Sequence, residues 1–280
     1  MSAVEKERVD ILLVQQGLFD SREQAKRAVM AGEILGENEE RLDKAGQKIP
    51  VTTELHFKGE KLKYVSRGGL KLEKALNDYD IAVQDKVVLD IGSSTGGFTD
   101  VALQNGAKLV YALDVGTNQL AWKLRTDERV KVMENTNFRY AKLSDFEFGQ
   151  PEFATIDVSF ISLGLILPPL SEIISMGGHV VALIKPQFEA GRASVGKNGI
   201  IKDALVHKKV LETVTQMMIN SGFSIEALTY SPIKGGQGNI EFLGVLVRED
   251  SGKMNDKINI DTLLSQTYAQ LNHTEGKADE

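Results

Sequence analysis

Cysteine is absent from the 280 residues of this sequence. Disulfide bonds, thiolate metal sites and a cysteine nucleophile are therefore excluded, and the composition is typical of a reducing cytoplasm. The histidines are few and scattered, and their spacing matches no metal site; they are His56, His179, His207 and His273. We therefore expect neither disulfides nor a bound metal.

A long hydrophobic run is also missing. The most apolar stretch, 160–170, is far shorter than the roughly twenty residues that a membrane-spanning helix needs, and Pro168-Pro169 interrupts it. The N-terminus is charged and lacks the apolar core of a secretory signal. We therefore expect a cytoplasmic protein without membrane contact.

The sequence also lacks an excess of positive charge, since its net charge is −6. Charged residues make up 26% of the chain and hydrophobic residues 42%. These proportions are typical of a soluble globular protein, and the length allows one large core and a small additional domain. An acidic balance argues against general affinity for nucleic acids. RNA binding would therefore have to depend on local clusters of lysine and arginine.

A glycine-rich turn is the most informative feature that is present. The apolar run 87–91 predicts a buried strand, the turn follows at Gly92 to Gly97, and a helix is expected from about Phe98. Glycines let the backbone approach a ligand, and the start of a helix points N–H groups at it. A second apolar run ends on Asp114, at the distance where a nucleotide-binding fold places a carboxylate for ribose hydroxyls. The turn predicts a cofactor site, although an ordinary turn without a ligand remains open from this motif alone.

The glycine spacing narrows the choice of cofactor. The order Asp90-x-Gly92-x-Ser94-x-Gly96-Gly97 differs from the G-x-G-x-x-G of dinucleotide-binding proteins. It is closer to the D-x-G-x-G-x-G of S-adenosylmethionine-dependent methyltransferases, with Ser94 in place of the middle glycine. No Lys-Ser or Lys-Thr pair follows, which excludes a phosphate-binding P-loop.

Apolar runs alternate with helical patterns from Asp85 onward, and this alternation predicts a parallel, doubly wound α/β sheet with helices on both faces. About seven strands are expected, at 87–91, 109–114, 130–134, 153–158, 179–185, 224–230 and 241–247. We place this domain at 70–250. A polar tail at 251–280 is expected to form a loose helix and a disordered end.

A smaller unit is expected at 1–60. Its pattern predicts a helix that ends at Gly17 and a second helix that Ser21 begins, with Gln24 placed to complete a capping box. Cations recur at helical spacing on this second helix, which fits either an RNA-binding surface or a solvated face. These predicted RNA contacts are Arg22, Lys26 and Arg27.

Two further basic segments lie outside these helices. We predict that 61–69 is both the hinge between the domains and the edge of an RNA groove, although a linker with incidental charge fits as well. We expect the glycine-rich stretch 191–202 to form a mobile lid that contacts RNA phosphates. The predicted RNA contacts in these two segments are Lys61, Lys63, Arg67, Arg192 and Lys197.

Three charged residues lie at the ends of predicted strands, namely Asp157, Lys185 and Glu241. Chemistry in an open parallel sheet gathers at the carboxyl ends of the strands. A buried charged side chain needs an oppositely charged partner or contact with solvent. For each of these residues taken singly, a solvent-exposed side chain at a strand end is as good an interpretation as a functional residue. Together with Lys71, at the start of a predicted helix, they make two cations and two carboxylates.

The order Lys71, Asp157, Lys185 and Glu241 resembles the K-D-K-E tetrad of FtsJ-like ribose 2′-O-methyltransferases. The motifs around these residues are similar to those of the TlyA family, whose members join an S4 RNA-binding domain to an FtsJ-like methyltransferase and are often labelled hemolysins. These motifs are S-R-G-G-x-K-L (66–72), D-I-G-S-S-T-G-G-F-T-D (90–100), D-V-S-F-I-S-L (157–163), K-P-Q-F-E (185–189), V-G-K-x-G-I (195–200) and G-x-x-G-N-x-E-F-L (235–243). In the N-terminal unit, R-x-D-x-x-L from Arg8 and S-R-x-x-A-x-x-x-V-x-x-G from Ser21 resemble the S4 domain, but the turn at 36–40 departs from its usual V-N-G.

The resemblance implies S-adenosylmethionine as cofactor and a cytidine ribose of ribosomal RNA, free or in ribosomal subunits, as substrate. The tetrad residues Lys71, Asp157, Lys185 and Glu241 would be catalytic. The implied cofactor contacts are Asp90, Gly92, Ser93, Ser94, Thr95, Gly96, Gly97, Phe98, Asp114, Val115, Asn137 and Asp157. Asn137 stands where the FtsJ pattern has an acidic residue near the adenine. The sequence does not indicate the oligomeric state.

A ribose 2′-hydroxyl is a poor nucleophile until its proton is drawn off. Our hypothesis is that Lys185 takes this proton, that the second cation, Lys71, favours the neutral form of Lys185, and that Asp157 and Glu241 orient the two lysines. A lysine that only steers the hydroxyl, with alignment supplying most of the rate, remains the alternative.

Three other functions fit parts of the sequence. A membrane-active cytolysin would agree with the hemolysin label, but the sequence has no spanning run and no strongly basic amphipathic helix. An RNA-binding protein with an inactive methyltransferase fold would have no physical reason to keep four charges at strand ends. An NAD-dependent dehydrogenase is disfavoured by the glycine spacing.

Overall fold

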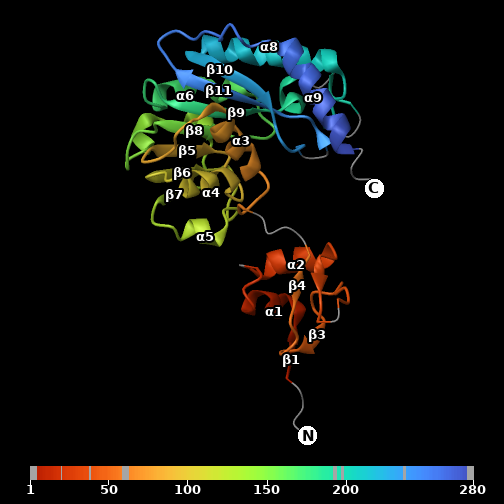
Figure 1. The fold of residues 1–280 in the computed structure, drawn as a ribbon. Coiled ribbons are helices and arrows are strands. Elements are labelled where there is room, and N and C mark those ends of the chain that lie inside the picture. Colours follow the sequence, from red (N-terminus) through yellow and green to blue (C-terminus); the bar gives the residue numbers. More distant parts are fainter. Residues whose placement is uncertain are drawn as a thin grey trace. The chain divides into compact units, whose positions relative to one another are not determined.

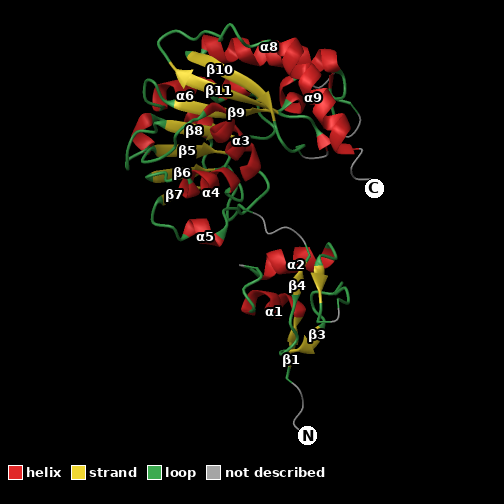
Figure 2. Cartoon of the chain, in the orientation of Figure 1, coloured by secondary structure: helices red, strands yellow, loops and turns green. Residues whose placement is uncertain are grey.

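The computed structural model describes residues 5–19, 21–37, 39–58, 63–191, 194–196, 199–235 and 238–275. It divides the chain into two compact units, Met1–Lys63 and Tyr64–Glu280. Figure 1 shows these units coloured along the sequence, and Figure 2 shows them by secondary structure.

The boundary between the units differs from the predicted linker at 61–69. The segment from Tyr64 onward belongs to the second unit. The Tyr64 side chain is buried, and the Val65 N–H donates to Asp100 Oδ2 at 2.9 Å. A buried aromatic ring and a backbone hydrogen bond fix this part of the chain, so it is not a free hinge.

The first unit is a small α+β fold. Its helices, α1 (Val9–Gln15) and α2 (Arg22–Met30), pack their apolar faces into one core. Short strands pair in antiparallel fashion, β1 (Lys6–Arg8) with β3 (Lys48–Pro50) and β2 (Ile34–Leu35) with β4 (His56–Phe57). Ser21 caps α2, as predicted, because its hydroxyl oxygen accepts the Gln24 N–H at 3.3 Å.

The second unit is a layered α/β fold. Its strands within the described residues are β5 (Val87–Ile91), β6 (Leu109–Leu113), β7 (Val130–Met133), β8 (Phe153–Ile156), β9 (His179–Ile184), β10 (Phe223–Tyr230) and β11 (Phe242–Arg248). Its helices are α3 (Gly69–Tyr79), α4 (Gly97–Gln104), α5 (Trp122–Arg125), α6 (Leu167–Ile173), α7 (Pro186–Glu189), α8 (Ala204–Asn220) and α9 (Ile260–Glu275), with 3-10 turns η1 (Phe138–Tyr140), η2 (Leu143–Asp145) and η3 (Leu163–Leu165). Each predicted strand is present, and the predicted fold class is confirmed.

In the described part of the chain these strands form one seven-stranded sheet in the order β10-β11-β9-β8-β5-β6-β7. The prediction of a wholly parallel sheet was wrong at β11, which runs antiparallel to both β9 and β10. The connection explains the difference, because the loop 231–241 is too short for the crossover of about a dozen or more residues that parallel neighbours need. The strand order reverses beside β5, so the crevice for a ligand is expected at the carboxyl ends of β5 and its neighbours.

Alternate residues of β5 enter opposite cores. Val87, Leu89 and Ile91 face a core shared with α6, α8 and α9, whereas Val88 faces a second core shared with α3, α4 and α5. Both faces of the sheet are therefore covered, as Figure 1 shows. This burial is the reason that the central strands are continuous apolar runs in the sequence.

The segment 251–280 was predicted to be a loose polar tail, but α9 packs firmly on the second unit. Leu263, Leu264 and Thr267 are buried. The Tyr268 hydroxyl also lies 2.5 Å from Nδ1 of the buried His207 on α8. Few apolar residues mark this helix in the sequence, and only contact with α8 shows that they form a packed face. Within the described residues, no helix combines the length and the apolar character needed to cross a lipid bilayer.

Candidate active site

The glycine-rich turn joins the centre of the sheet to α4. Gly92 (φ 85°) and Gly96 (φ 100°) adopt left-handed backbone conformations that favour glycine. A Cβ atom at Gly92 would lie 2.4 Å from the carbonyl oxygen of Asp157. The turn therefore packs directly against the segment that follows β8, and the two share one edge of the sheet.

Asp90 lies beneath this turn and is 1% exposed. Its carboxylate accepts hydrogen bonds from Thr99 Oγ1 at 2.6 Å and from Thr155 Oγ1 at 2.8 Å. Burial raises the pKa of Asp90 to about 6, and the two hydroxyl groups oppose this rise. The two carboxylate oxygens of Asp90 therefore connect β5 to α4 and β8. A direct contact between this side chain and a cofactor stays a prediction.

Replacing Asp90 by asparagine is expected to change how stability depends on pH. Between pH 3.8 and about 6 the unfolded chain ionises this carboxyl while the folded protein keeps it protonated, so the wild-type free energy of unfolding falls as the pH rises through this window. The loss amounts to about 3 kcal/mol and is complete above about pH 6. The Asp90→Asn variant should lack it, because an amide does not titrate. Urea unfolding of both proteins from about pH 4 to about pH 7 measures the effect, and a constant stability difference would contradict it.

Three other predicted cofactor contacts follow β6 and β7. Asp114 Oδ2 accepts the Ser94 N–H at 2.8 Å, and Asp114 Oδ1 accepts the Gly116 N–H at 2.7 Å. Val115 is exposed. Asn137 is exposed and accepts the Arg139 N–H at 3.2 Å. The Asp114 carboxylate therefore holds the glycine-rich turn in this structure, and its predicted contact with a ribose stays a prediction.

The four residues of the predicted tetrad form a continuous chain of charged side chains. Lys71 Nζ lies 2.6 Å from Glu241 Oε2 and 3.8 Å from Asp157 Oδ2. Lys185 Nζ lies 2.5 Å from Asp157 Oδ1. Lys71, Lys185 and Glu241 are 6%, 9% and 3% exposed. Buried charges of this kind are tolerated only when each has a partner, and here every lysine contacts a carboxylate.

The sheet topology explains how these residues meet. Asp157 directly follows β8, and Lys185 directly follows β9, so both lie at the carboxyl edge of parallel strands. Glu241 directly precedes β11, which runs antiparallel with Phe242 opposite Ile184. The start of β11 therefore reaches the same edge as the end of β9. Lys71, in the first turn of α3, completes the group from a position 170 residues before Glu241.

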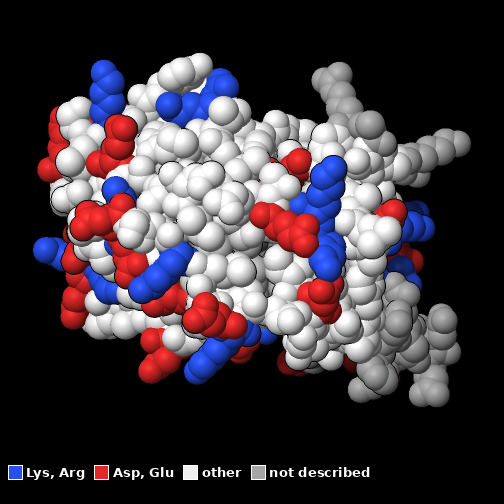
Figure 3. Space-filling view, turned by 90° about the horizontal axis from the view of Figure 1, so that it is seen from above, with Lys and Arg blue, Asp and Glu red and all other residues white. Residues whose placement is uncertain are grey.

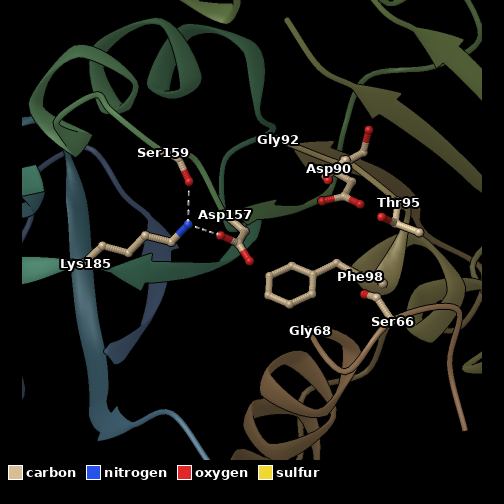
Figure 4. Close-up of a pocket in the computed structure, with 12 residues that line it drawn as sticks. Ser66, Gly68, Asp90, Gly92, Thr95, Phe98, Asp157, Ser159 and Lys185 are labelled. Atoms are coloured by element: carbon tan, nitrogen blue, oxygen red, sulfur yellow. Dashed lines mark hydrogen bonds and ion pairs between the residues drawn. The ribbon is translucent and has the colours of Figure 1, made fainter. Parts of the chain in front are cut away.

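A pocket of about 250 Å³ adjoins the tetrad. It is lined by Ser66, Gly68, Asp90, Gly92, Ser93, Ser94, Thr95, Gly97, Phe98, Asp157, Ser159 and Lys185. Figure 4 shows Asp157, Ser159 and Lys185 converging at one end of the pocket, with Asp90 and Thr95 at the other. Most of the predicted cofactor contacts therefore share one cavity with Asp157 and Lys185.

Ser66, Gly68 and Ser159 also line the pocket, and the sequence motifs did not predict them as pocket residues. Lys185 Nζ donates to Ser159 Oγ at 3.0 Å, which makes Ser159 a neighbour of the tetrad. All three residues stand within the quoted motifs 66–72 and 157–163. They lie in turns, where no periodicity indicates the direction of a side chain, so the sequence pattern alone does not single them out.

A folded loop before β11 holds Glu241. The Gly235 N–H donates to the Asn239 carbonyl at 2.9 Å, and a Cβ at Gly235 would lie 2.0 Å from Glu241 Oε1. The buried Asn239 side chain accepts the Ile201 N–H at 3.1 Å and donates to the Gly199 carbonyl at 3.0 Å. The stretch predicted to be a mobile lid is therefore anchored at its end, next to the loop that supports Glu241.

The predicted RNA contacts lie in several places. Exposed positions on α2 carry Arg22, Lys26 and Arg27. Arg22 also pairs with the buried carboxylate of Asp10 at 3.0 Å. Lys63 and Arg67 are exposed on either side of the boundary between the units. The remaining predicted contacts, Lys61, Arg192 and Lys197, fall outside the described residues.

Comparison with known proteins identifies the family of this chain. A model of the FtsJ-like methyltransferase family matches residues 64–248. YqxC of Bacillus subtilis strain 168, whose name describes an rRNA methyltransferase, is 62% identical over 238 residues, which are 85% of this chain and 84% of that protein. The 16S/23S rRNA (cytidine-2′-O)-methyltransferase TlyA of Mycobacterium tuberculosis strain H37Rv is 39% identical over 241 residues, which are 84% of this chain and 87% of that protein.

A solved structure from Streptococcus thermophilus, described under the name hemolysin, is 59% identical and superimposes with a TM-score of 0.77. The superposition covers 98% of this chain and 100% of that one, so it includes both units. Matches of this extent confirm the resemblance that the motifs indicate: this chain belongs to the FtsJ-like methyltransferase family and, within it, to the TlyA group.

Proposed function

We propose that this protein transfers a methyl group from S-adenosylmethionine to the 2′-hydroxyl of a cytidine ribose in ribosomal RNA. One observation carries the proposal, namely the continuous chain Glu241–Lys71–Asp157–Lys185 at the wall of a glycine-lined pocket. The name of the Mycobacterium tuberculosis relative specifies the cytidine 2′-oxygen, and we infer that the four charged side chains of this chain serve to deprotonate such a hydroxyl beside the cofactor.

The pocket fits the proposed cofactor. At the start of α4 the Thr99 N–H bonds to Asp90 and the Asp100 N–H to the Gly96 carbonyl. The N–H groups of Gly97 and Phe98 are the proposed donors for a carboxylate such as that of the methionine group. A Cβ at Gly97 would lie 2.4 Å from Ser66 Oγ, so a side chain there would close the space beside these donors. The volume of about 250 Å³ is close to the lower limit of about 300 Å³ for ligand pockets. It suits the methionine end, and the adenosine would extend toward Asp114 and Val115. When bound, this cofactor supplies an electrophilic methyl group.

Lys185 is the residue that we propose accepts the proton of the ribose hydroxyl. Lys185 lines the pocket, whereas Lys71 is not among the residues that line it and has Glu241 as its nearest carboxylate. Asp157 contacts both lysines and so fixes the distance between them. Because the Asp157 carboxylate lies between the two cations, it opposes the repulsion that Lys71 exerts on protonated Lys185. We therefore assign Lys71 chiefly to holding the two carboxylates in place.

An exposed aromatic ring lies beside the tetrad. Phe160 is 91% exposed, and its ring centroid is 5.0 Å from that of Phe188. Aromatic rings are the surfaces on which proteins stack unpaired bases. We propose that Phe160 stacks on the base of the target nucleotide, because it follows Asp157 and Ser159 on the same segment.

RNA affinity is proposed to come from local cations. Figure 3, seen from the α8 side, shows lysine and arginine interspersed with acidic residues around a wide uncharged area, so this face is not a uniformly basic surface. The exposed Arg22, Lys26 and Arg27 on α2 are the proposed phosphate contacts in the S4-like unit, since ionic contacts to phosphates supply most nonspecific RNA affinity.

The function is tested by incubating the full-length protein with methyl-labelled S-adenosylmethionine and ribosomal subunits from a strain that lacks the gene. We expect label in 2′-O-methylcytidine of ribosomal RNA, and calorimetric binding of S-adenosylmethionine but not of NAD. Label in a base instead of a ribose, or no label in any RNA, would contradict the proposal. Leakage of liposomes that persists after Lys185→Ala would instead support the activity that the name hemolysin describes.

A further inference from the structure

Two segments at the carboxyl edge of the sheet are fastened to each other at both ends. At one end, Lys185 Nζ lies 2.5 Å from Asp157 Oδ1 and donates to Ser159 Oγ at 3.0 Å. At the other end, Glu189 accepts the Ser162 hydroxyl at 2.6 Å and the Leu163 N–H at 2.8 Å. The segment 157–163 is therefore held against the segment 185–189, and Ser159 has a fixed position opposite Lys185.

The backbone is strained between these two ends. Phe160 has a φ of 63°, a left-handed conformation that costs energy in any residue with a side chain. This conformation turns the chain directly after Ser159. As a result the Phe160 ring faces solvent and contacts Phe188, with ring centroids 5.0 Å apart. The Ser159 hydroxyl points toward Lys185, as Figure 4 shows.

The stereochemistry of an amine gives this hydroxyl a role. A neutral lysine has two N–H groups and one lone pair in a tetrahedral arrangement. Ser159 Oγ accepts one hydrogen of Lys185 Nζ at 3.0 Å, and the negatively charged Asp157 Oδ1, 2.5 Å from the same nitrogen, attracts a second. The lone pair is then left with a single direction. With Asp157 alone, the amine could rotate about its terminal bond, and the lone pair would be spread over several directions.

We propose that Ser159 is a positioning residue that directs the lone pair of Lys185 toward the ribose hydroxyl in the pocket. The inference rests on the proposed function, because it concerns the proton acceptor of that reaction. Ser159 acts through Lys185 and takes no proton itself. It is exposed and lines the pocket, so replacing its side chain does not open a cavity in the core.

The test compares Ser159→Ala with Ser159→Thr in the full-length protein, using methyl transfer to ribosomal subunits from the deletion strain. Loss of a hydrogen bond to an ionisable group is expected to lower kcat about 10- to 100-fold in Ser159→Ala. The KM for RNA and the Kd for S-adenosylmethionine should stay within about twofold, because the interactions that hold both ligands equally in the ground state and the transition state are unaffected. Ser159→Thr keeps the hydroxyl and should retain kcat within about threefold.

A matched control separates positioning from loss of loop order. Ser162→Ala removes a hydroxyl from the same segment, but this hydroxyl bonds to Glu189 and not to Lys185. We expect a smaller loss of kcat than in Ser159→Ala. An equal loss in both variants, or a wild-type kcat in Ser159→Ala, would overturn the inference while the proposed function stands. Absence of methyl transfer by the wild-type protein would overturn the proposed function and, with it, this inference.

Discussion

Replacing Lys185 by alanine is expected to lower the rate of methyl transfer to ribosomal RNA by about 100- to 10,000-fold, the range that general acid–base catalysis contributes. The affinity for S-adenosylmethionine should remain within about threefold, because only one of the residues that line the pocket changes. Single-turnover rates and calorimetry measure the two quantities separately. Asp157 keeps a second cation, Lys71 Nζ at 3.8 Å, so the remaining charges stay partly balanced.

The Lys185→Arg variant distinguishes a base from a charge that only steers the hydroxyl. Arginine stays protonated at any pH at which proteins are stable, so it cannot accept the proton, although it keeps the positive charge. If Lys185 is the base, Lys185→Arg should be as inactive as Lys185→Ala. If alignment supplies most of the rate, arginine should restore a substantial part of it. Near-normal methylation by Lys185→Ala would remove this mechanism altogether.

Replacing Lys71 by methionine is expected to abolish activity and to lower the free energy of unfolding by about 3–5 kcal/mol. Glu241 is 3% exposed and has Lys71 Nζ as an ion-pair partner at 2.6 Å. Without Lys71, the Glu241 carboxylate stays buried against Gly235 and has lost this ion pair. Urea unfolding followed by far-ultraviolet circular dichroism measures the loss in the second unit, which holds most of the secondary structure.

A double variant and a neighbouring lysine complete this experiment. Adding Glu241→Leu to Lys71→Met removes both charges, so most of the lost stability should return while activity does not, because apolar residues often replace a buried ion pair without loss. Lys74→Met changes a lysine one turn later on α3 that pairs with Asp78 near the surface, and it should cost about 0.5 kcal/mol or less. An unchanged free energy of unfolding in Lys71→Met would contradict the expectation that the buried Lys71–Glu241 ion pair stabilises the fold.

Local signals in the sequence located the elements of the second unit well. The run 87–91, the glycines of the turn and the run that ends before Asp114 identified the strand, turn and strand that the structure shows. These elements depend on short-range properties, namely burial on both faces and glycine at left-handed positions. The motifs also named four charged residues that the structure brings together.

Other features depend on contacts between distant residues and left little trace in the sequence. The antiparallel direction of β11 is explained by the length of the loop 231–241. The hydrophobic pattern of a strand does not itself indicate whether the strand runs parallel or antiparallel to its neighbours. The packing of α9 depends on a few buried residues that a polar composition hides. Ser159 and Glu189 acquire their roles only because the segments that carry them lie face to face.

The family, the glycine-rich turn and the candidate charged residues were predictable from the amino-acid sequence, because they are properties of contiguous motifs. The ion pairs within the tetrad, Lys71 with Glu241 and Lys185 with Asp157, became visible only in the folded protein. Ion pairing is a matter of distances of a few ångströms between side chains that the chain separates by up to 170 residues. Such distances are set by strand order and register, which no single motif contains.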